Sequence, residues 1–239
     1  MLETVSFQTI LFLDIETVPE VFDYAQLSAE KKLLWDKKMQ FSRREGDTTE
    51  SLYMRAGVYA EFAKVICISV GYFEKQKTES TFYLKSFYGD NEKQLLLDFS
   101  DFLSARYGRK NFLFCAHNGK EFDYPFLARR MLIQRIPLPP SLQLAGKKPW
   151  EVKHLDTLEL WKFGDYKNFT SLALLANIFS IPSPKEDMEG GDVAPAYYLE
   201  KNVKKIVDYC QKDVLTVAQL LLCFKGEDLL HEKNVFIVE

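Results

Sequence analysis

The sequence lacks the features of a zinc protein or of a disulfide-stabilised protein. Its 239 residues include only four cysteines and three histidines. The cysteines form no C-x-x-C pair, and no histidine stands at zinc-site spacing from them. Cys67 and Cys115 lie inside apolar segments. We therefore expect reduced cysteines in a hydrophobic core, without a structural zinc ion.

The chain also lacks long hydrophobic runs. No apolar segment approaches the roughly 18 residues of a membrane span. The N-terminus has no basic stretch followed by an apolar segment, as a signal peptide would. A cytoplasmic protein is therefore expected. No internal repeat, low-complexity tract or linker is found, so residues 1–239 are predicted to form a single domain, with a helical insertion near 21–60.

An excess of positive charge is absent as well. The 31 Lys and Arg residues face 34 Asp and Glu residues, which gives a net charge of −3. The chain thus has no overall basic character of the kind that gives tight, non-specific nucleic-acid binding. A nucleic-acid enzyme stays compatible with this balance, because acidic metal ligands lower the net charge and bound metal ions reverse its local sign.

The most informative segment is the strand predicted over residues 9–18, TILFLDIETV. Its short apolar run indicates a central strand that is covered on both faces. Asp14 and Glu16 follow this run two residues apart, so they point to the same face, roughly 7 Å apart at their Cα atoms. Buried carboxylates are costly unless they are compensated, and a pair of them suits Mg²⁺ or Mn²⁺. The alternative is that both acids are solvated or cap the next turn.

Strand and helix patterns alternate along the rest of the chain. The predicted strands are residues 64–73, 81–87, 111–116, 151–155 and 234–238, with a hairpin loop at 74–80. The predicted helices start at Ser28 and Asn91 and cover residues 125–134, 171–179 and 196–224. This order predicts an α/β fold with a mixed sheet flanked by helices.

Two polar segments have a structural and a functional interpretation. Residues 42–50 resemble a surface loop, or a flap over a substrate channel with Arg43 and Arg44 facing phosphates. The acidic loop at 185–193 contains Asp187, Glu189 and Asp192, which we expect to be solvated or capping rather than metal ligands.

Further acids follow other predicted elements. Asp123 comes shortly after the strand at 111–116, next to Pro125, which favours the first turn of a helix. Sites in open α/β sheets form at such carboxyl ends of strands. Asp156 with Glu159 has the spacing of a capping box, and capping is the favoured role of Asp156. On the last long helix, Tyr209 and Asp213 are four residues apart and share one side.

Three short motifs occur in a meaningful order: DIET at 14–17, HNGKEFDYPFL at 117–127 and YCQKDV at 209–214. They resemble the three motifs of the tyrosine branch of the DEDD 3′→5′ exonucleases. The closest resemblance is to stand-alone proteins similar to the proofreading exonuclease domain of family-B DNA polymerases, which share a ribonuclease H-like fold. The stretch between the second and third motifs is similar too, so the resemblance spans nearly the whole chain.

This resemblance implies a site with two divalent metal ions. Asp14 would bridge the two ions, Glu16 and Asp213 would hold the ion that binds the attacking water, and Asp123 would support the second ion through water. Tyr209 would orient the water by its hydroxyl. Because free tyrosine has a pKa near ~10, positioning is a better-founded role for it than general-base catalysis.

The resemblance also implies substrate contacts. The backbone at Thr17 would approach the terminal 3′ hydroxyl, and Asn118 would form a hydrogen bond in the region of the penultimate nucleotide. Phe122 would line the pocket for the strand end. Such a pocket suits single-stranded ends. The resemblance to DNA polymerase domains favours DNA as the substrate, and RNA is the alternative. His117 is interpreted as structural or adjacent to substrate, not as a base.

The sequence fits two other functions less well. A phosphatase with an aspartyl-phosphate intermediate starts with D-x-D-x-T after an apolar strand, but here Glu16 replaces the second aspartate. Its downstream lysine beside an acidic pair has only a faint counterpart, and the motifs at Asp123 and Asp213 would stay unexplained. A catalytically silent binding module on the same fold should have lost one or more of the acids, and none is lost.

Overall fold

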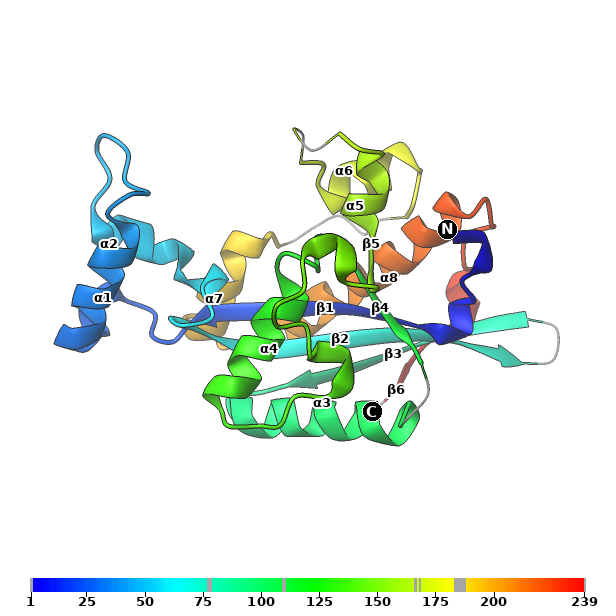
Figure 1. Cartoon of the computed structure of the whole chain (residues 1–239), viewed down its shortest axis with the longest axis horizontal. Coiled ribbons are helices and arrows are strands. Elements are labelled where there is room, and N and C mark those ends of the chain that lie inside the picture. The colour runs from blue at the N-terminus through cyan, green and yellow to red at the C-terminus, as the bar shows by residue number, and fades with distance from the viewer. Residues whose placement is uncertain are drawn as a thin grey trace.

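A single mixed sheet organises the protein. The computed structural model describes residues 2–76, 79–108, 111–165, 167, 169–182 and 188–238. In these ranges, six strands pair in the order β5-β4-β1-β2-β3-β6 (Figure 1). Strand β2 is antiparallel to β1 and to β3, whereas the pairs β1–β4, β4–β5 and β3–β6 are parallel. The strands are β1 (Ile10–Pro19), β2 (Ala63–Gln76), β3 (Glu79–Tyr88), β4 (Leu113–Ala116), β5 (Leu155–Asp156) and β6 (Val235–Val238).

Eight α-helices in the described ranges surround this sheet. Side chains of Ser28, Asn91, Ser171 and Asn202 accept backbone N–H groups at the starts of α1, α3, α6 and α8. The arrangement confirms the predicted α/β, ribonuclease H-like fold. The helices are α1 (Ala29–Met39), α2 (Thr49–Leu52), α3 (Glu92–Arg106), α4 (Asp123–Ile133), α5 (Thr157–Lys162), α6 (Leu172–Ile178), α7 (Val193–Tyr198) and α8 (Val203–Phe224).

Strand β1 is buried on both faces, as predicted. Leu11 and Leu13 pack in one core cluster with side chains of α3 and α4. Ile10 and Phe12 point the other way and pack in a second cluster with side chains of α8. Because side chains alternate along a strand, the residues that follow at even positions continue on the α8 face. The core therefore determines which face of the sheet carries the acids of β1.

The segment predicted as an insertion is largely helical and packs around its own core. Trp35 is fully buried there, and its ring Nε1–H donates to Thr49 O at 2.9 Å. Helices α1 and α2 lie together at one end of the molecule, beyond the end of β1 (Figure 1). Between them, residues 40–48 form turns, and Arg43 and Arg44 are exposed there. The single-domain organisation stays a prediction.

Three element boundaries differ from the prediction. Strands β2 and β3 continue through most of the predicted loop at 74–80, whose residues 77–78 lie outside the described ranges. The strand predicted at 151–155 is reduced to Leu155–Asp156, because a 3₁₀ turn (Pro149–Glu151) precedes it and Asp156 caps α5. The helix predicted at 196–224 is two helices, because Lys201 has a left-handed φ of 51° and Asn202 starts a new helix.

The acidic loop agrees with its structural interpretation where it is described. Glu189 and Asp192 are exposed and form a capping box, in which Asp192 Oδ2 accepts from Glu189 N at 2.9 Å. Asp187 lies outside the described residues.

Helices that are both long and apolar enough to cross a bilayer are absent from the described ranges.

Candidate active site

Asp14 and Glu16 share the face of β1 that is covered by α8. One carboxylate oxygen of each and the Sγ of Cys210 all lie within 4.8 Å of one another. Glu16 is only 8% exposed. The pairing of β1 with β2 shifts register between Glu16 and Thr17. Such bulges occur next to active sites, where they redirect a side chain. The predicted same-face placement of the two acids thus agrees with the structure.

Helix α8 brings the C-terminal residues of the site to β1. The thiol of Cys210 donates to the backbone O of Asp14 at 3.4 Å, which fixes the helix against the strand. Asp213 lies close enough to Asp14 and Glu16 for its charge to raise the pKa of both carboxyl groups. Tyr209 is half-buried, one helical turn before Asp213, and packs beside the apolar residues of α7 and α8.

Asp123 comes from a third segment, the connection between β4 and α4. It is the first residue of α4 and is 4% exposed. Its charge raises the pKa of Asp14 and of Glu16, and the charge of Asp213 acts on Asp123 in the same direction. Four carboxylates from β1, the start of α4 and α8 therefore form one electrostatic cluster.

Burial and mutual repulsion both oppose ionisation of this cluster. The pKa of Asp14 lies well above its usual value, first because of desolvation and then because of Glu16, Asp213 and Asp123. Desolvation and the charge of Asp213 raise the pKa of Glu16 in the same way. Desolvation raises the pKa of Asp123 to about 7, although backbone hydrogen bonds of Asp123 and Ile15 lower it. Asp14, Glu16 and Asp123 form no ion pair with any described residue.

The cluster suits a divalent cation with oxygen ligands. Among the described residues, Asp14 Oδ2 and Asp123 Oδ1 are the buried side-chain atoms without a hydrogen-bond partner. Native structures rarely leave such atoms unpaired, unless an ion or water binds them. Burial, followed by a hydrogen bond to Cys67, raises the pKa of the Cys210 thiol well above its usual value. Cys210 is therefore a neutral thiol, and the donors are hard carboxylate oxygens, which Mg²⁺ and Mn²⁺ prefer.

The predicted substrate-contact residues border this cluster. Thr17 follows Glu16 directly, and its hydroxyl donates to Gly57 O at 2.7 Å. Phe122 precedes Asp123, is half-buried, and has its ring centroid 5.3 Å from that of Phe126. Asn118 lies on the connection between β4 and α4 and has a left-handed φ of 63°. Their contacts with substrate stay a prediction.

Asp156 has a larger role than the predicted cap. Its Oδ1 accepts from Leu158 N at 3.0 Å and Glu159 N at 3.2 Å, which confirms that it caps α5. Oδ1 also accepts from Asn118 N at 2.9 Å, and Oδ2 accepts from Lys120 N at 3.0 Å. Asp156 thus fixes the connection that leads to Asp123. Sequence spacing could not reveal this, because the partners lie 36–38 residues away.

We expect Asp156→Ala to destabilise the fold by roughly 3 kcal/mol, because it leaves buried N–H groups unpaired and removes a cap. Urea unfolding measures the loss. Asp156→Asn is the matched variant: its amide oxygen can keep the three bonds of Oδ1, so a smaller loss is expected. Equal stability of wild type and Asp156→Ala would contradict this role.

His117 supports the same connection. Its Nδ1 is 2.9 Å from Thr157 Oγ1, and its Nε2 is 2.9 Å from Thr170 O. Desolvation lowers its pKa, so the ring is neutral. A carbonyl oxygen only accepts, so Nε2–H donates to Thr170 and Nδ1 accepts from the Thr157 hydroxyl. Both ring nitrogens are engaged, which agrees with the structural interpretation of His117.

Comparison with known proteins identifies a family whose model matches this chain. A family model described as a predicted 3′-5′ exonuclease related to the exonuclease domain of PolB matches residues 58–227. The match covers more than half of the chain and includes Asn118, Asp123, Tyr209 and Asp213, whereas Asp14 and Glu16 precede it. No curated protein matches the chain significantly.

Proposed function

Because the chain belongs to the family of predicted 3′-5′ exonucleases related to the exonuclease domain of PolB, we propose that it hydrolyses single-stranded nucleic acid from the 3′ end. DNA is the favoured substrate, and the reaction requires two divalent metal ions, Mg²⁺ or Mn²⁺. The observation that carries this proposal is the meeting of carboxylates from three chain segments, with two buried oxygen atoms unpaired among the described residues.

Asp14, Glu16, Asp123 and Asp213 would hold the ions. When bound, two such ions activate a water molecule and stabilise the charge on the leaving oxygen of the phosphodiester. The four carboxylates are supported by strand β1 and by the starts and sides of packed helices, so they need little rearrangement before the reaction. Such preorganisation favours electrostatic stabilisation of the transition state.

Other residues of the chain would orient the reactants. The hydroxyl of Tyr209 would hydrogen-bond the attacking water and align it with the phosphorus. The backbone at Thr17 would bind the terminal 3′ hydroxyl, while Asn118 and Phe122 would hold the last nucleotides. An unpaired strand end fits this arrangement, since its bases are free to pack against apolar side chains.

Tyr209→Phe tests the orienting role. We expect kcat to fall by about 10- to 100-fold, the effect of losing one hydrogen bond of roughly 1–3 kcal/mol. The affinity for Mn²⁺, measured by calorimetry, should not change, because the carboxylates stay in place. An unchanged kcat would exclude the role, and a loss of Mn²⁺ affinity would assign Tyr209 to metal binding instead.

The proposed function itself is tested with single-stranded DNA and RNA of the same sequence, each labelled at the 5′ end. Incubation with Mg²⁺ or Mn²⁺ should shorten the DNA progressively from its 3′ end and should shorten the RNA more slowly. EDTA should stop both reactions. Faster RNA digestion would make the protein an exoribonuclease. Binding without cleavage by the metal-loaded protein would favour the silent module.

A further inference from the structure

A second surface feature adjoins the candidate active site. A cavity of about 270 Å³ opens beside the connection between β4 and α4, and its lining includes Asn118, Lys120, Trp150, Leu158 and Lys162. We call it the Trp150 pocket. It shares Asn118 with the predicted substrate contacts. Asp156 also lines it and lies close enough to Asp123 for its charge to raise the pKa of that carboxyl group, so the pocket is near the carboxylate cluster.

The aromatic wall of the pocket is exposed. The side chain of Trp150 is 73% exposed, and the ammonium of Lys148 lies 5.1 Å from the centroid of its ring. A single exposed aromatic residue is common and carries no meaning alone. Here the indole lines a cavity and has a lysine beside it, which is the combination that single-strand binding proteins use to stack bases and hold phosphates.

The polar groups of the pocket favour a neutral occupant at its centre. Asp156 is saturated by backbone N–H groups, and Lys120 forms an ion pair with Glu159. These carboxylates, with Glu121, would repel a phosphate placed inside. A nucleobase carries no charge and presents a flat face to the indole, so it fits where a phosphate does not.

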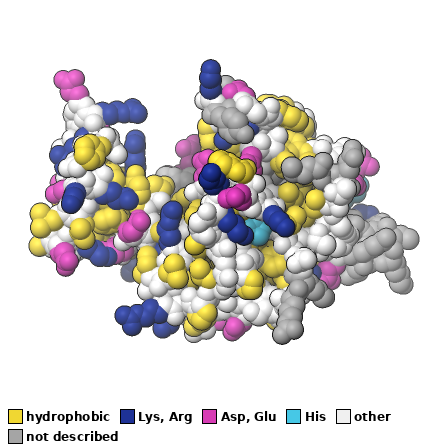
Figure 2. All heavy atoms as spheres, viewed as in Figure 1, with side chains coloured by type: hydrophobic (Ala, Val, Ile, Leu, Met, Phe, Trp, Pro, Cys, Tyr) yellow, Lys and Arg dark blue, Asp and Glu magenta, His cyan; other side chains and the backbone are white. Residues whose placement is uncertain are grey.

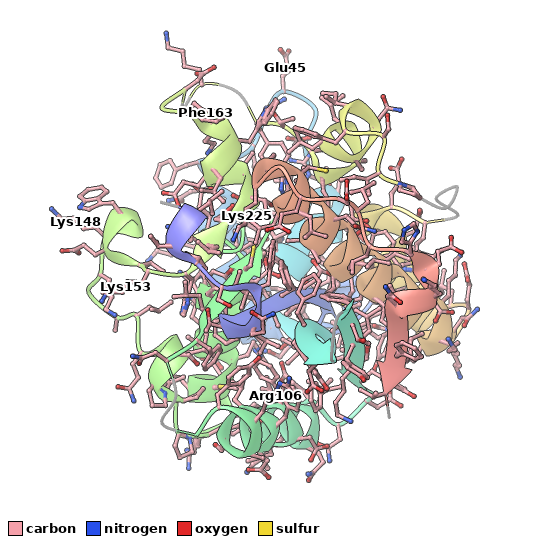
Figure 3. The ribbon with its side chains drawn as sticks, turned by 90° about the vertical axis from the view of Figure 1, so that its right-hand side faces the viewer. Glu45, Arg106, Lys148, Lys153, Phe163 and Lys225 are labelled. Carbon is pink, nitrogen blue, oxygen red and sulfur yellow. The ribbon has the colours of Figure 1, made fainter. Side chains whose placement is uncertain are left out.

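Two lysines that are not ion-paired with described residues lie at the pocket: Lys162 lines it, and Lys148 lies beside the ring of Trp150. The exposed Lys147 and Lys153 form no ion pair among the described residues either. Lys148 and Lys153 both lie on the left side of the molecule in Figure 3. Figure 2 shows several Lys or Arg side chains gathered on the front face, in the region below α5. The charges of Lys148 and Lys162 would complement the phosphates on either side of a base in the pocket.

We propose that the Trp150 pocket binds a nucleobase of the substrate strand upstream of the terminal nucleotides, stacked on the indole of Trp150, with Lys148 and Lys162 beside the flanking phosphates. This inference rests on the proposed function, because it assigns the pocket to the strand that the exonuclease would digest. It predicts that long strands bind more tightly than short ones and that Trp150 causes the difference.

Fluorescence tests the inference without any cleavage. Trp150 is strongly exposed, whereas Trp35 is fully buried and Trp161 half-buried, so quenching by thymine bases reports mainly on Trp150. The titration uses Asp14→Asn protein in EDTA, with a thymidine dinucleotide and an oligothymidine of about eight nucleotides. The longer strand should quench the emission saturably, and the dinucleotide should not.

A variant then links the pocket to substrate use. Trp150→Ala should raise the KM for the longer strand by roughly 5- to 100-fold, the equivalent of one lost stacking contact, and should leave kcat unchanged. Trp150→Phe should restore most of the affinity. Phe236→Ala is the matched control, because Phe236 is 49% exposed on β6, at the opposite edge of the sheet from β5.

The outcomes separate the two proposals. Digestion by the wild type with an unchanged KM in Trp150→Ala overturns the pocket assignment and leaves the proposed function in place. Absence of digestion by the metal-loaded wild type overturns the proposed function, and absence of quenching by the longer strand overturns the pocket assignment.

Discussion

Asp14→Asn is expected to slow the digestion of single-stranded DNA by about 10³-fold or more. The substitution keeps the size of the side chain but removes one of the charges that would hold the metal ions. Metal ions contribute several kcal/mol to transition-state stabilisation, and each 1.36 kcal/mol corresponds to about tenfold in rate. Initial rates at saturating Mg²⁺, measured with 5′-labelled DNA, give the ratio between variant and wild type.

The same substitution should increase the stability of the metal-free fold. Asp14 Oδ2 is buried without a hydrogen-bond partner among the described residues, and three neighbouring carboxylates repel the Asp14 carboxylate. Asp14→Asn removes this repulsion, so we expect a higher melting temperature than that of wild type in EDTA at neutral pH. A purely structural role of Asp14 predicts the reverse, a less stable and inactive protein.

Asp208→Asn is the control for both measurements. Asp208 lies on α8, as Asp213 does, but its side chain is 44% exposed and pairs with Lys204 one turn earlier. Exposed pairs of this kind contribute little to stability. We therefore expect unchanged activity and nearly unchanged melting. A similar loss of activity in Asp208→Asn and Asp14→Asn would mean that removing any acidic charge near the site slows the reaction, whether or not the residue belongs to the cluster.

The stabilisation by Mg²⁺ is expected to grow strongly as pH rises. Asp14, Glu16 and Asp123 have folded-state pKa values above their usual values, that of Asp123 at about 7. Such groups hold their protons more tightly in the folded than in the unfolded chain. Their contribution to stability is therefore present at pH values below the unfolded pKa, near 4, and is lost as pH rises through the folded pKa. Bound Mg²⁺ would take the place of these protons and so restore the stability that is lost as pH rises.

Melting temperatures in EDTA and in millimolar Mg²⁺ at several pH values measure this effect. The difference should be small near pH 5 and larger near pH 8. At a hundredfold excess over Kd, a ligand stabilises by about 2.7 kcal/mol, which corresponds to roughly 5–10 °C in a protein of this size. In Asp14→Asn the difference should shrink at every pH. A constant difference between pH 5 and pH 8 would contradict the assignment of Mg²⁺ to these carboxylates.

Local patterns explain most of what could be predicted from the sequence. The apolar run at 10–13 indicated the central strand, and alternation along it placed Asp14 and Glu16 on one face. Helix caps were also predictable, because Ser28 and Asn91 act within three residues of their own position. These features depend on residues that are neighbours in the chain, so they can be predicted from a single sequence.

Features that depend on distant contacts could not be predicted. Asp156 joins the start of α5 to a connection 36–38 residues earlier, and the ring of His117 is held by residues 40 and 53 positions later. The break between α7 and α8 was missed because apolar residues continue across it at helical spacing. Trp150 gave no signal, because an exposed aromatic residue lacks periodicity and only the fold brings it beside Asn118.

Calorimetric titration of the metal-free protein with Mn²⁺ is the most direct test of the central claim, that Asp14, Glu16, Asp123 and Asp213 form one metal centre. We predict saturable binding to wild type and Asp208→Asn, and a large loss of binding in both Asp14→Asn and Asp213→Asn, since these two residues are on separate segments of one cluster. Equal Mn²⁺ binding in all four proteins, each shown to be folded, would contradict the account.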